Sequence, residues 1–311
     1  MAIPSSLPRP AEPAAAAPRS LADDRPYFGI GLTCLAMAIF SVMDGLSKLL
    51  TRDFAPPQIA WARFLFILVF LVPVVLLRKG PRTLRSTRPW LQVARGFCML
   101  FSALLFIFGL SFLPIADATS IGFVSPLFVT ALSIPILGEK VGVRRWLAVL
   151  VGFLGILVLV RPGSSAFTAA AFFPVASSAC WALGLIITRI MQSSDTVLTT
   201  LAWSTAVGFL AVTPPALPVW HAPSLEGWAM LAAAALLSMI GQLFLISAFR
   251  FAPASLLAPF SYTQIVWSTL IGLFVFGSLP GPHTFIGAAI VVGSGLYILH
   301  RERVVRGQKR G

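Results

Sequence analysis

The sequence predicts an all-α membrane protein: ten transmembrane helices arranged as two inverted five-helix repeats. Three observations predict this class: 58% of the 311 residues are hydrophobic, only 11% are charged, and the mean hydropathy is +0.90. A soluble domain could not bury so much apolar surface. Because a helix needs about 20 apolar residues to cross the hydrocarbon core, a chain of this length holds many spans and little else.

Ten apolar segments of helical length follow one another with short connections between them. Proline and glycine mark many of the connections, as in Pro280-Gly281-Pro282, because both residues tend to end helices. The predicted helices are Phe28–Leu50, Ile59–Leu77, Trp90–Phe112, Ala116–Leu137, Trp146–Val160, Ala169–Ile190, Val197–Val219, Gly227–Phe249, Ala254–Phe276 and Thr284–His300.

Lysine and arginine are distributed unequally over the connections. Most lie in the tails and after the second and fourth predicted helices, whereas Lys48, Arg52 and Arg161 would lie on the other side. The positive-inside rule therefore predicts a multi-pass protein of the plasma (inner) membrane with both termini in the cytoplasm, and an even number of spans agrees with it. Residues 1–27 are predicted to be a disordered cytoplasmic tail and residues 302–311 a basic cytoplasmic tail.

The two halves of the chain are weakly similar to each other. The segment FIFGLSFLPIADATSIGFVSP aligns with FLISAFRFAPASLLAPFSYTQ, so that Pro114 matches Pro253 and Phe123 matches Tyr262. An offset near 140 residues holds along most of both halves. Because five spans per half is an odd number, the second repeat would insert upside down. We therefore expect repeats over residues 28–161 and 168–301.

The run from FLPIADATS to VLVRPG resembles the end of the first repeat in EamA-type carriers of the drug/metabolite transporter superfamily. The matching positions are Ser125-Pro126, Gly138-Glu139 and Pro162-Gly163, and the resemblance extends over about Phe28 to Arg301. It implies ten helices, a central substrate path lined by the first, third, fourth, sixth, eighth and ninth helices, and alternating access. In the second half Ser278 stands where the first half has Glu139, which departs from the symmetry.

Charged side chains within the apolar segments are candidates for the site, because ionisable groups in a membrane are costly and usually face the bundle interior. Asp44 and Lys48, in FSVMDGLSK, are spaced i, i+4 and lie on one helix face. They form either a structural ion pair or a substrate or proton-coupling site. Arg63, in WARFLF, is predicted either to bind a substrate carboxylate or phosphate bidentately or to bridge to Asp44.

Uncharged polar and aromatic side chains extend the candidate site. Gln242, Tyr262 and Gln264 are expected either to hydrogen-bond the substrate near the midplane or to join helices. Trp181 is the best candidate for stacking on a ring, and Trp203 is a further one.

Two prolines inside predicted helices, and two residues near helix ends, complete the predictions. Pro126, in the middle of the fourth predicted helix, and Pro259, early in the ninth, each free a backbone carbonyl, so they mark gates or hinges, or else simple bends. Trp61 is predicted to anchor its helix at the membrane interface. Arg95 is predicted to extend its side chain to the lipid headgroups.

The predicted function is secondary transport of a small polar or zwitterionic metabolite, such as an amino acid or a nucleotide-related metabolite. The two repeats would rock about the central site, driven by protons or by exchange. A channel or facilitative pore is the alternative, and an intramembrane enzyme a remote one, because no nucleophile or metal set recurs at a common depth. The expected partners are the substrate and the bilayer, with no cofactor, metal or nucleic acid. The sequence does not determine whether the protein forms a homodimer.

Overall fold

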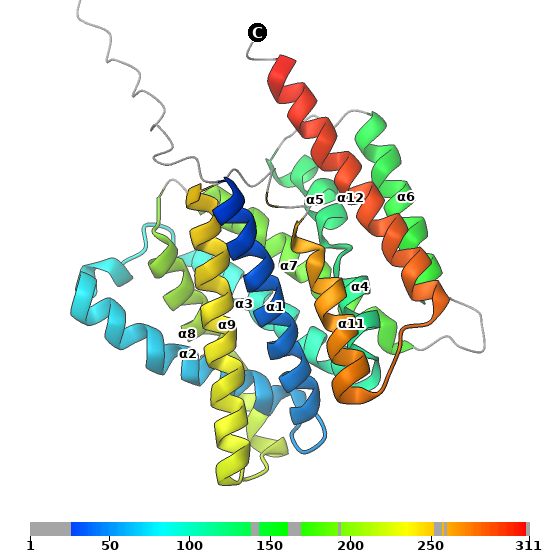
Figure 1. Ribbon diagram of the computed structural model, residues 1–311. Coiled ribbons are helices and arrows are strands. Elements are labelled where there is room, and N and C mark those ends of the chain that lie inside the picture. The colour runs from blue at the N-terminus through cyan, green and yellow to red at the C-terminus, as the bar shows by residue number, and fades with distance from the viewer. Residues whose placement is uncertain are drawn as a thin grey trace, which may run out of the picture.

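The computed structural model describes residues 26–137, 143–160, 169–191, 194–251, 257 and 260–308, and all regular structure in these residues is helical (Figure 1). Three short 3-10 segments, Pro81–Leu84, Ala169–Ala171 and Leu217–Val219, adjoin the α-helices. The helices are α1 Pro26–Leu50, α2 Pro56–Lys79, α3 Pro89–Phe112, α4 Ile115–Gly122, α5 Ser125–Leu137, α6 Val143–Val160, α7 Phe172–Met191, α8 Val197–Ala216, α9 Leu225–Phe251, α11 Thr263–Phe276 and α12 Pro282–Gln308.

Six of the described helical stretches are long and apolar enough to cross a membrane, and three shorter helical stretches are also apolar. The six are Tyr27–Leu50, Pro56–Leu77, Pro89–Phe112, Ala169–Thr188, Leu198–Val219 and Leu225–Leu245. Each of the ten predicted segments overlaps at least one described helix. The chain is therefore a multi-pass helical membrane protein.

Proline and glycine set several of these helix ends. Pro56 begins α2 and Pro89 begins α3, where a missing backbone N–H costs nothing because the first turn has no intrahelical acceptor for it. Gly80 follows α2 with φ 76°, and Gly277 follows α11 with φ 62°. Both conformations suit glycine because a Cβ is disfavoured there.

The fourth predicted helix, Ala116–Leu137, is divided in two, so the prediction of one continuous helix is wrong. α4 ends at Gly122 and α5 begins at Ser125. Pro126 therefore lies in the first turn of α5 rather than in the middle of a helix, which is the position where proline is tolerated best. The other predicted hinge, Pro259, lies outside the described residues, as do residues 1–25.

The last helix is longer than predicted. α12 continues to Gln308, beyond the predicted end at His300, and takes in most of the segment predicted to be a basic tail. The apolar run ends near His300, but arginine, glutamate and glutamine are good helix formers and continue the helix.

The main helix pairs each join the N-terminal half of the chain to the C-terminal half. α1 packs most extensively on α9, α2 on α8, α3 on α7 and α6 on α12, and α4 packs on α11. In Figure 1, α6 and α12 lie side by side. Glycines allow close approach: a Cβ at Gly96 in α3 would lie 2.6 Å from Val207 in α8, and one at Gly241 in α9 would lie 2.6 Å from Phe40 in α1. The halves therefore interlock.

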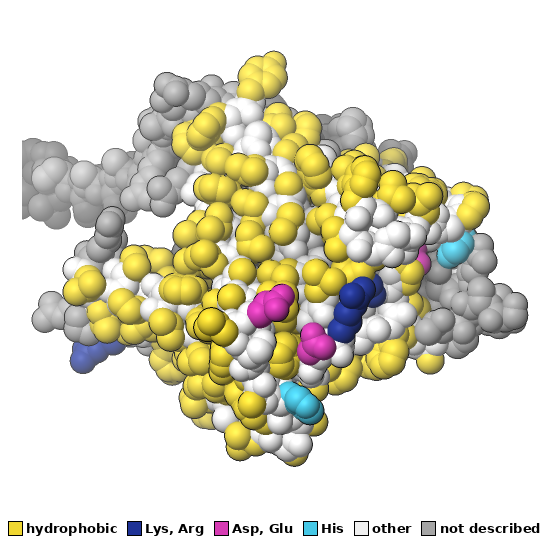
Figure 2. Space-filling model, turned by 60° about the horizontal axis from the view of Figure 1, so that its bottom comes forward, with side chains coloured by type: hydrophobic (Ala, Val, Ile, Leu, Met, Phe, Trp, Pro, Cys, Tyr) yellow, Lys and Arg dark blue, Asp and Glu magenta, His cyan; other side chains and the backbone are white. Residues whose placement is uncertain are grey.

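The two ends of the bundle differ. α1 begins and α12 ends at the same end of the molecule (Figure 1). Figure 2 shows the opposite end, where hydrophobic side chains cover most of the described surface and charged side chains are few. Arg85 and Arg88, in the connection between α2 and α3, are exposed.

Candidate functional site

A buried carboxylate lies where α1 meets α11. The side chain of Asp44 is only 4% exposed, and Gln264 Nε2 donates a hydrogen bond of 3.1 Å to its Oδ2. One turn earlier on α1, Ser41 Oγ donates to the backbone carbonyl of Gln264 at 3.2 Å. A single neutral donor compensates a buried carboxylate incompletely, so Asp44 can accept a further donor or a cation.

Arg63, on α2, carries the charge that complements this carboxylate. The two side chains interact electrostatically, yet no salt bridge joins them, and Arg63 makes no hydrogen bond within the described part of the chain. The predicted direct bridge to Asp44 is therefore not formed. Arg63 is half-buried, so its guanidinium donors are available to another acceptor.

The predicted ion pair between Asp44 and Lys48 is not formed either. Lys48 Nζ instead donates to the backbone carbonyls of Leu110 at 2.8 Å and Leu113 at 2.6 Å, at the end of α3. It also lies 5.7 Å from the centre of the Phe276 ring. The last carbonyls of a helix lack intrahelical partners, so a nearby lysine satisfies them. Lys48 thereby fixes the end of α3 against α1.

The other predicted site residues divide into two groups. Tyr262 is half-buried close to Gln264 in sequence, and its ring centre lies 5.0 Å from that of Phe123, at the break between α4 and α5. No hydrogen bond or ring contact among the described residues connects Trp181 or Gln242 to this group. Trp181, on α7, is 42% exposed, and Gln242, on α9, is half-buried.

Two hydroxyl groups on α4 were not among the sequence-based candidates. Thr119 Oγ1 and Ser120 Oγ are buried without a hydrogen-bond partner among the described residues. Ile115, one turn before Thr119 on the same face, lies 3.9 Å from where a Cβ would stand on Gly45, the residue next to Asp44. The only sequence signal was the short run of small polar residues in ADATS.

Three further predictions change because the side chains concerned bind protein groups. Arg95 does not extend to the lipid headgroups: its Nε donates to Thr188 Oγ1 at 2.5 Å and its guanidinium also binds Ser204. Trp203 is not free to stack on a ring without a protein partner: its indole N–H donates to the carbonyl of Leu84, in the α2–α3 connection, at 2.8 Å. These polar partners lie on neighbouring helices or loops, and an apolar segment alone does not reveal them.

Trp61 is likewise more than an interfacial anchor. Its ring is half-buried and packs against Phe209, 5.4 Å away, and Trp220, 5.0 Å away. Its indole N–H donates to Thr213 Oγ1 at 3.1 Å. The side chain thus joins α2 to α8 and to the segment that follows α8.

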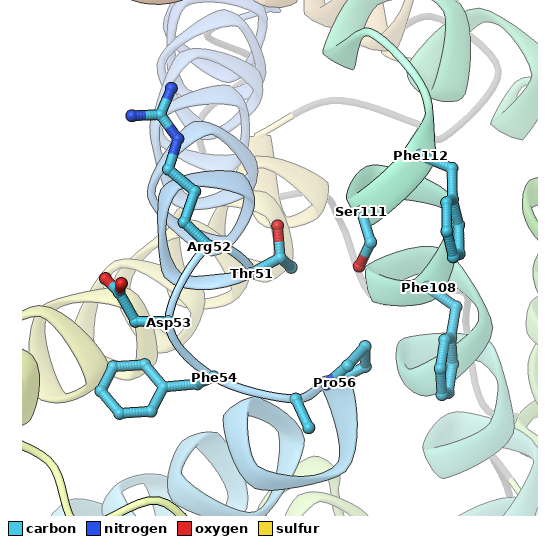
Figure 3. Close-up of a pocket in the computed structure, with 9 residues that line it drawn as sticks. Thr51, Arg52, Asp53, Phe54, Pro56, Phe108, Ser111 and Phe112 are labelled. Atoms are coloured by element: carbon cyan, nitrogen blue, oxygen red, sulfur yellow. The ribbon is translucent and has the colours of Figure 1, made fainter.

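A hollow of about 360 Å³ opens where α1 ends and α2 begins. Figure 3 shows Phe108 and Phe112 of α3 forming one wall, with Thr51 and Pro56 opposite, while Arg52 and Asp53 extend away from the two rings. Neither Asp44 nor Arg63 lines it, and no other predicted site residue does so. The charged residues of its lining, Arg52 and Asp53, are both exposed. Charges exposed to water attract a ligand less strongly than charges inside the bundle, so Asp44 and Arg63 remain the better candidate site.

Comparison with known proteins places these features in a family. Residues 27–161 and 168–299 match the EamA-like transporter family. The S-adenosylmethionine uptake transporter of Rickettsia prowazekii (strain Madrid E) is 29% identical over 88% of this chain and 93% of its own length. The riboflavin transporter of Vibrio cholerae serotype O1 is 27% identical over 85% of this chain and 90% of its own length.

An exporter and a solved structure are also similar. The pseudopaline exporter CntI of Pseudomonas aeruginosa (strain UCBPP-PA14) is 27% identical over 85% of this chain and 93% of its own length. A protein of known crystal structure superposes with a TM-score of 0.62 over 89% of this chain and 98% of its own, at 20% identity. That last likeness concerns the fold alone.

Proposed function

This chain belongs to the EamA-like transporter family, and we propose on that premise that it moves a small zwitterionic metabolite across the inner membrane by alternating access. The family and the transporters similar to it point to a membrane transporter of small metabolites and not to an enzyme. The finer assignment, of cargo and of residues, rests on the charges inside the membrane.

The observation that carries the proposal is the unbridged pair Asp44 and Arg63. The two side chains attract each other, but neither salt bridge nor hydrogen bond joins them. A zwitterion satisfies both: its ammonium group binds the carboxylate of Asp44, and its carboxylate binds the guanidinium of Arg63 bidentately. A neutral cargo would leave two costly charges inside the membrane without a direct ionic partner.

The neighbouring groups fit a cargo that also carries a ring. Tyr262 and Phe123 offer aromatic faces, and Gln264 offers an amide. Thr119, on α4, which packs on α11, offers a hydroxyl without a hydrogen-bond partner among the described residues. S-adenosylmethionine, named for the Rickettsia relatives, combines an α-amino acid group with an adenine ring. We assign Trp181 and Gln242 to the path along which the cargo moves, and not to the site that binds the charged groups of the cargo.

The proposed architecture is ten spans in two inverted repeats with both termini in the cytoplasm. The start of α1 and the end of α12 lie at the same end of the bundle, which supports this architecture, and so do the exposed arginines at the α2–α3 connection. The helix pairs constrain the motion, since rocking two intact halves would separate every main pair. We therefore assign the gating to individual helices, including the α4–α5 break at Pro126 and the segment containing Pro259.

Uptake into proteoliposomes tests the proposal. The protein should accumulate tritiated S-adenosylmethionine saturably and support counterflow, and riboflavin, which has no amino acid group, should not compete. We expect Asp44→Asn and Arg63→Gln each to lower uptake by about tenfold or more, since each removes a charge-assisted contact worth roughly 1.4 kcal/mol or more. Arg52→Gln, which alters an exposed arginine near the hollow, is the matched control and should leave uptake unchanged.

The outcomes separate the possibilities. If both charge variants fold and transport like the wild type, the zwitterion site is wrong. If ring compounds without an amino acid group, such as riboflavin, compete with S-adenosylmethionine, and amino acids without a ring do not, then Asp44 and Arg63 are structural and the aromatic residues select the cargo. A flux that does not saturate and shows no counterflow would replace the carrier with a channel. Proton coupling through Asp44 is tested by imposing a pH gradient, which should lose its effect in Asp44→Asn.

A further inference from the structure

Hydrogen bonds hold the connection between α2 and α3 against the start of α8. Thr199 Oγ1 donates to the carbonyl of Thr83 at 2.5 Å, and Trp203 Nε1 donates to the carbonyl of Leu84 at 2.8 Å. Both donors lie in the first two turns of α8. We call this set of contacts the first clasp.

Asp195, just before α8, extends the first clasp. Its carboxylate accepts hydrogen bonds from Ser86 Oγ at 2.5 Å, from Thr87 N at 3.0 Å and from Thr87 Oγ1 at 3.2 Å. Gln92 Nε2, in the first turn of α3, donates to the same carboxylate at 2.7 Å. One carboxylate thus ties the start of α3 to the start of α8.

An equivalent set of contacts lies at the opposite end of the α2–α8 pair. Gln58, fully buried in α2, donates from Nε2 to the carbonyl of His221 at 2.5 Å and accepts from the backbone N–H of His221 at 2.9 Å. Trp61 donates to Thr213 and packs edge-on against Trp220. This second clasp holds the segment between α8 and α9 against the start of α2.

The two clasps correspond position by position. Gln58 is the third residue of α2 and Thr199 the third of α8, and each donates to a backbone carbonyl of the loop beyond the partner helix. A tryptophan follows within about one turn in both helices, at Trp61 and Trp203. Because α2 and α8 pack along each other, the clasps fix the pair at both ends.

We propose that Gln58, Trp61, Thr199 and Trp203 are positioning residues that keep α2 and α8 assembled as a frame throughout the transport cycle. This inference rests on the alternating access of the proposed function. Arg63 lies on α2 just after Trp61 and has no hydrogen-bond partner of its own among the described residues, so the helix alone sets its place. The frame would hold Arg63 fixed while α11, with Gln264 and Tyr262, opens against α1.

The division between frame and moving parts follows from what joins them. In each clasp a buried side chain, Gln58 or Thr199, binds a backbone carbonyl, and separating the clasp would leave both groups unpaired in each cycle. No comparable set of contacts ties α11 to α2 or α8 among the described residues. α11 meets α1 through the hydrogen bonds of Gln264 with Ser41 and Asp44, and through the close approach of Gly45 to Ile271.

Disulfide trapping distinguishes a frame from a gate. In a background with Cys34, Cys98 and Cys180 replaced by alanine, Ser86→Cys/Asp195→Cys bridges the first clasp. The matched pair Gly45→Cys/Ile271→Cys bridges α1 and α11, where a Cβ on Gly45 would lie 2.9 Å from the Ile271 side chain. Uptake of tritiated S-adenosylmethionine by proteoliposomes is compared before and after oxidation.

The oxidised clasp pair should retain uptake, because a static contact does not limit a conformational step, whereas the oxidised α1–α11 pair should lose roughly 90% of it. Reductant should restore the lost uptake. The inference is overturned if oxidising the clasp pair abolishes uptake and reductant restores it, since the clasp would then be a gate. It is also overturned if the α1–α11 disulfide leaves uptake intact.

A distance measurement covers the second clasp and does not depend on transport. Spin labels at Ala55 and His221 report the clasp, and labels at Ala55 and Leu279 report the frame against the end of α11. The first pair should give one narrow distance distribution with and without S-adenosylmethionine. Two populations across Ala55 and His221 would refute the frame. If the wild-type protein does not take up tritiated S-adenosylmethionine, the proposed cargo is wrong. The distance between Ala55 and His221 still tests whether the frame is rigid.

Discussion

Lys48 provides a direct test of how the end of α3 is held. Its amino group donates to the carbonyls of Leu110 and Leu113 and lies over the Phe276 ring. Lys48→Met keeps an unbranched side chain of similar length but removes the charge and both donors. The two carbonyls then lose their partner, and α1, α3 and the end of α11 lose the group that joins them.

The size of the effect follows from these contacts. A hydrogen bond to a charged group contributes about 1.5–3 kcal/mol net, and a cation–π contact about 0.5–1 kcal/mol at an exposed site. Lys48 is half-buried, so water can replace part of each hydrogen bond and the lower values apply. We therefore expect Lys48→Met to lower the free energy of unfolding by about 3 kcal/mol.

The assay is reversible unfolding of purified protein in mixed micelles, followed by tryptophan fluorescence. Arg52→Met is the matched control, because Arg52 is exposed and approaches the same ring at 5.8 Å without a hydrogen bond in the described structure. Its loss should cost at most about 0.5 kcal/mol. Lys48→Arg should recover part of the stability. Equal losses in Lys48→Met and Arg52→Met would refute the capping role of Lys48.

Three further predictions concern packing and polar contacts. Burial acts to raise the pKa of the Asp195 carboxyl, but hydrogen bonds from the α2–α3 connection and from α3 lower it below the ordinary 3.8. The stability it adds is present above that value and lost as pH falls through the lower folded-state pKa, so Asp195→Asn should flatten the acid limb of a stability-against-pH curve. Gly96→Ala should cost about 1–3 kcal/mol by overpacking α3 on α8, whereas Gly31→Ala, with open space around it, should cost nothing in the same unfolding assay. Thr284→Val should cost about 1–3 kcal/mol because Asp117 loses its 2.6 Å hydrogen bond, and Thr284→Ser should restore it in a thermal melt.

The helices were predictable to the extent that hydropathy and proline define them. α1, α2 and α3 begin within a few residues of the predicted positions, since a long apolar run must form its backbone hydrogen bonds internally in lipid. The break between α4 and α5 was not predicted, because hydropathy continues through Phe123 and Val124 while the helix does not. Pro126 indicated an irregularity in this helix, but it did not indicate on which side of the proline the helix would end.

The candidate site was predictable in its residues but not in their partners. Asp44 and Arg63 were conspicuous because charges are rare in apolar segments. Local spacing suggested Lys48 as the partner of Asp44, yet Lys48 binds the end of α3 and Gln264 binds Asp44. A spacing of four residues allows two side chains of one helix to meet, but it does not require them to do so. Which of several possible partners is chosen depends on helices more than 60 residues away in sequence.

The sequence by itself determined the membrane class, the helical segments and the rare charges among them, because each of these follows from local composition in an apolar solvent. Only the tertiary structure decided that each main helix pair crosses between the halves, that Asp44 and Arg63 stay unbridged, and that tryptophans at the starts of α2 and α8 hold distant loops. Those features depend on which surfaces of separate helices meet. Helices in lipid gain no hydrophobic preference for one neighbour over another, so close packing and interhelical hydrogen bonds make the choice.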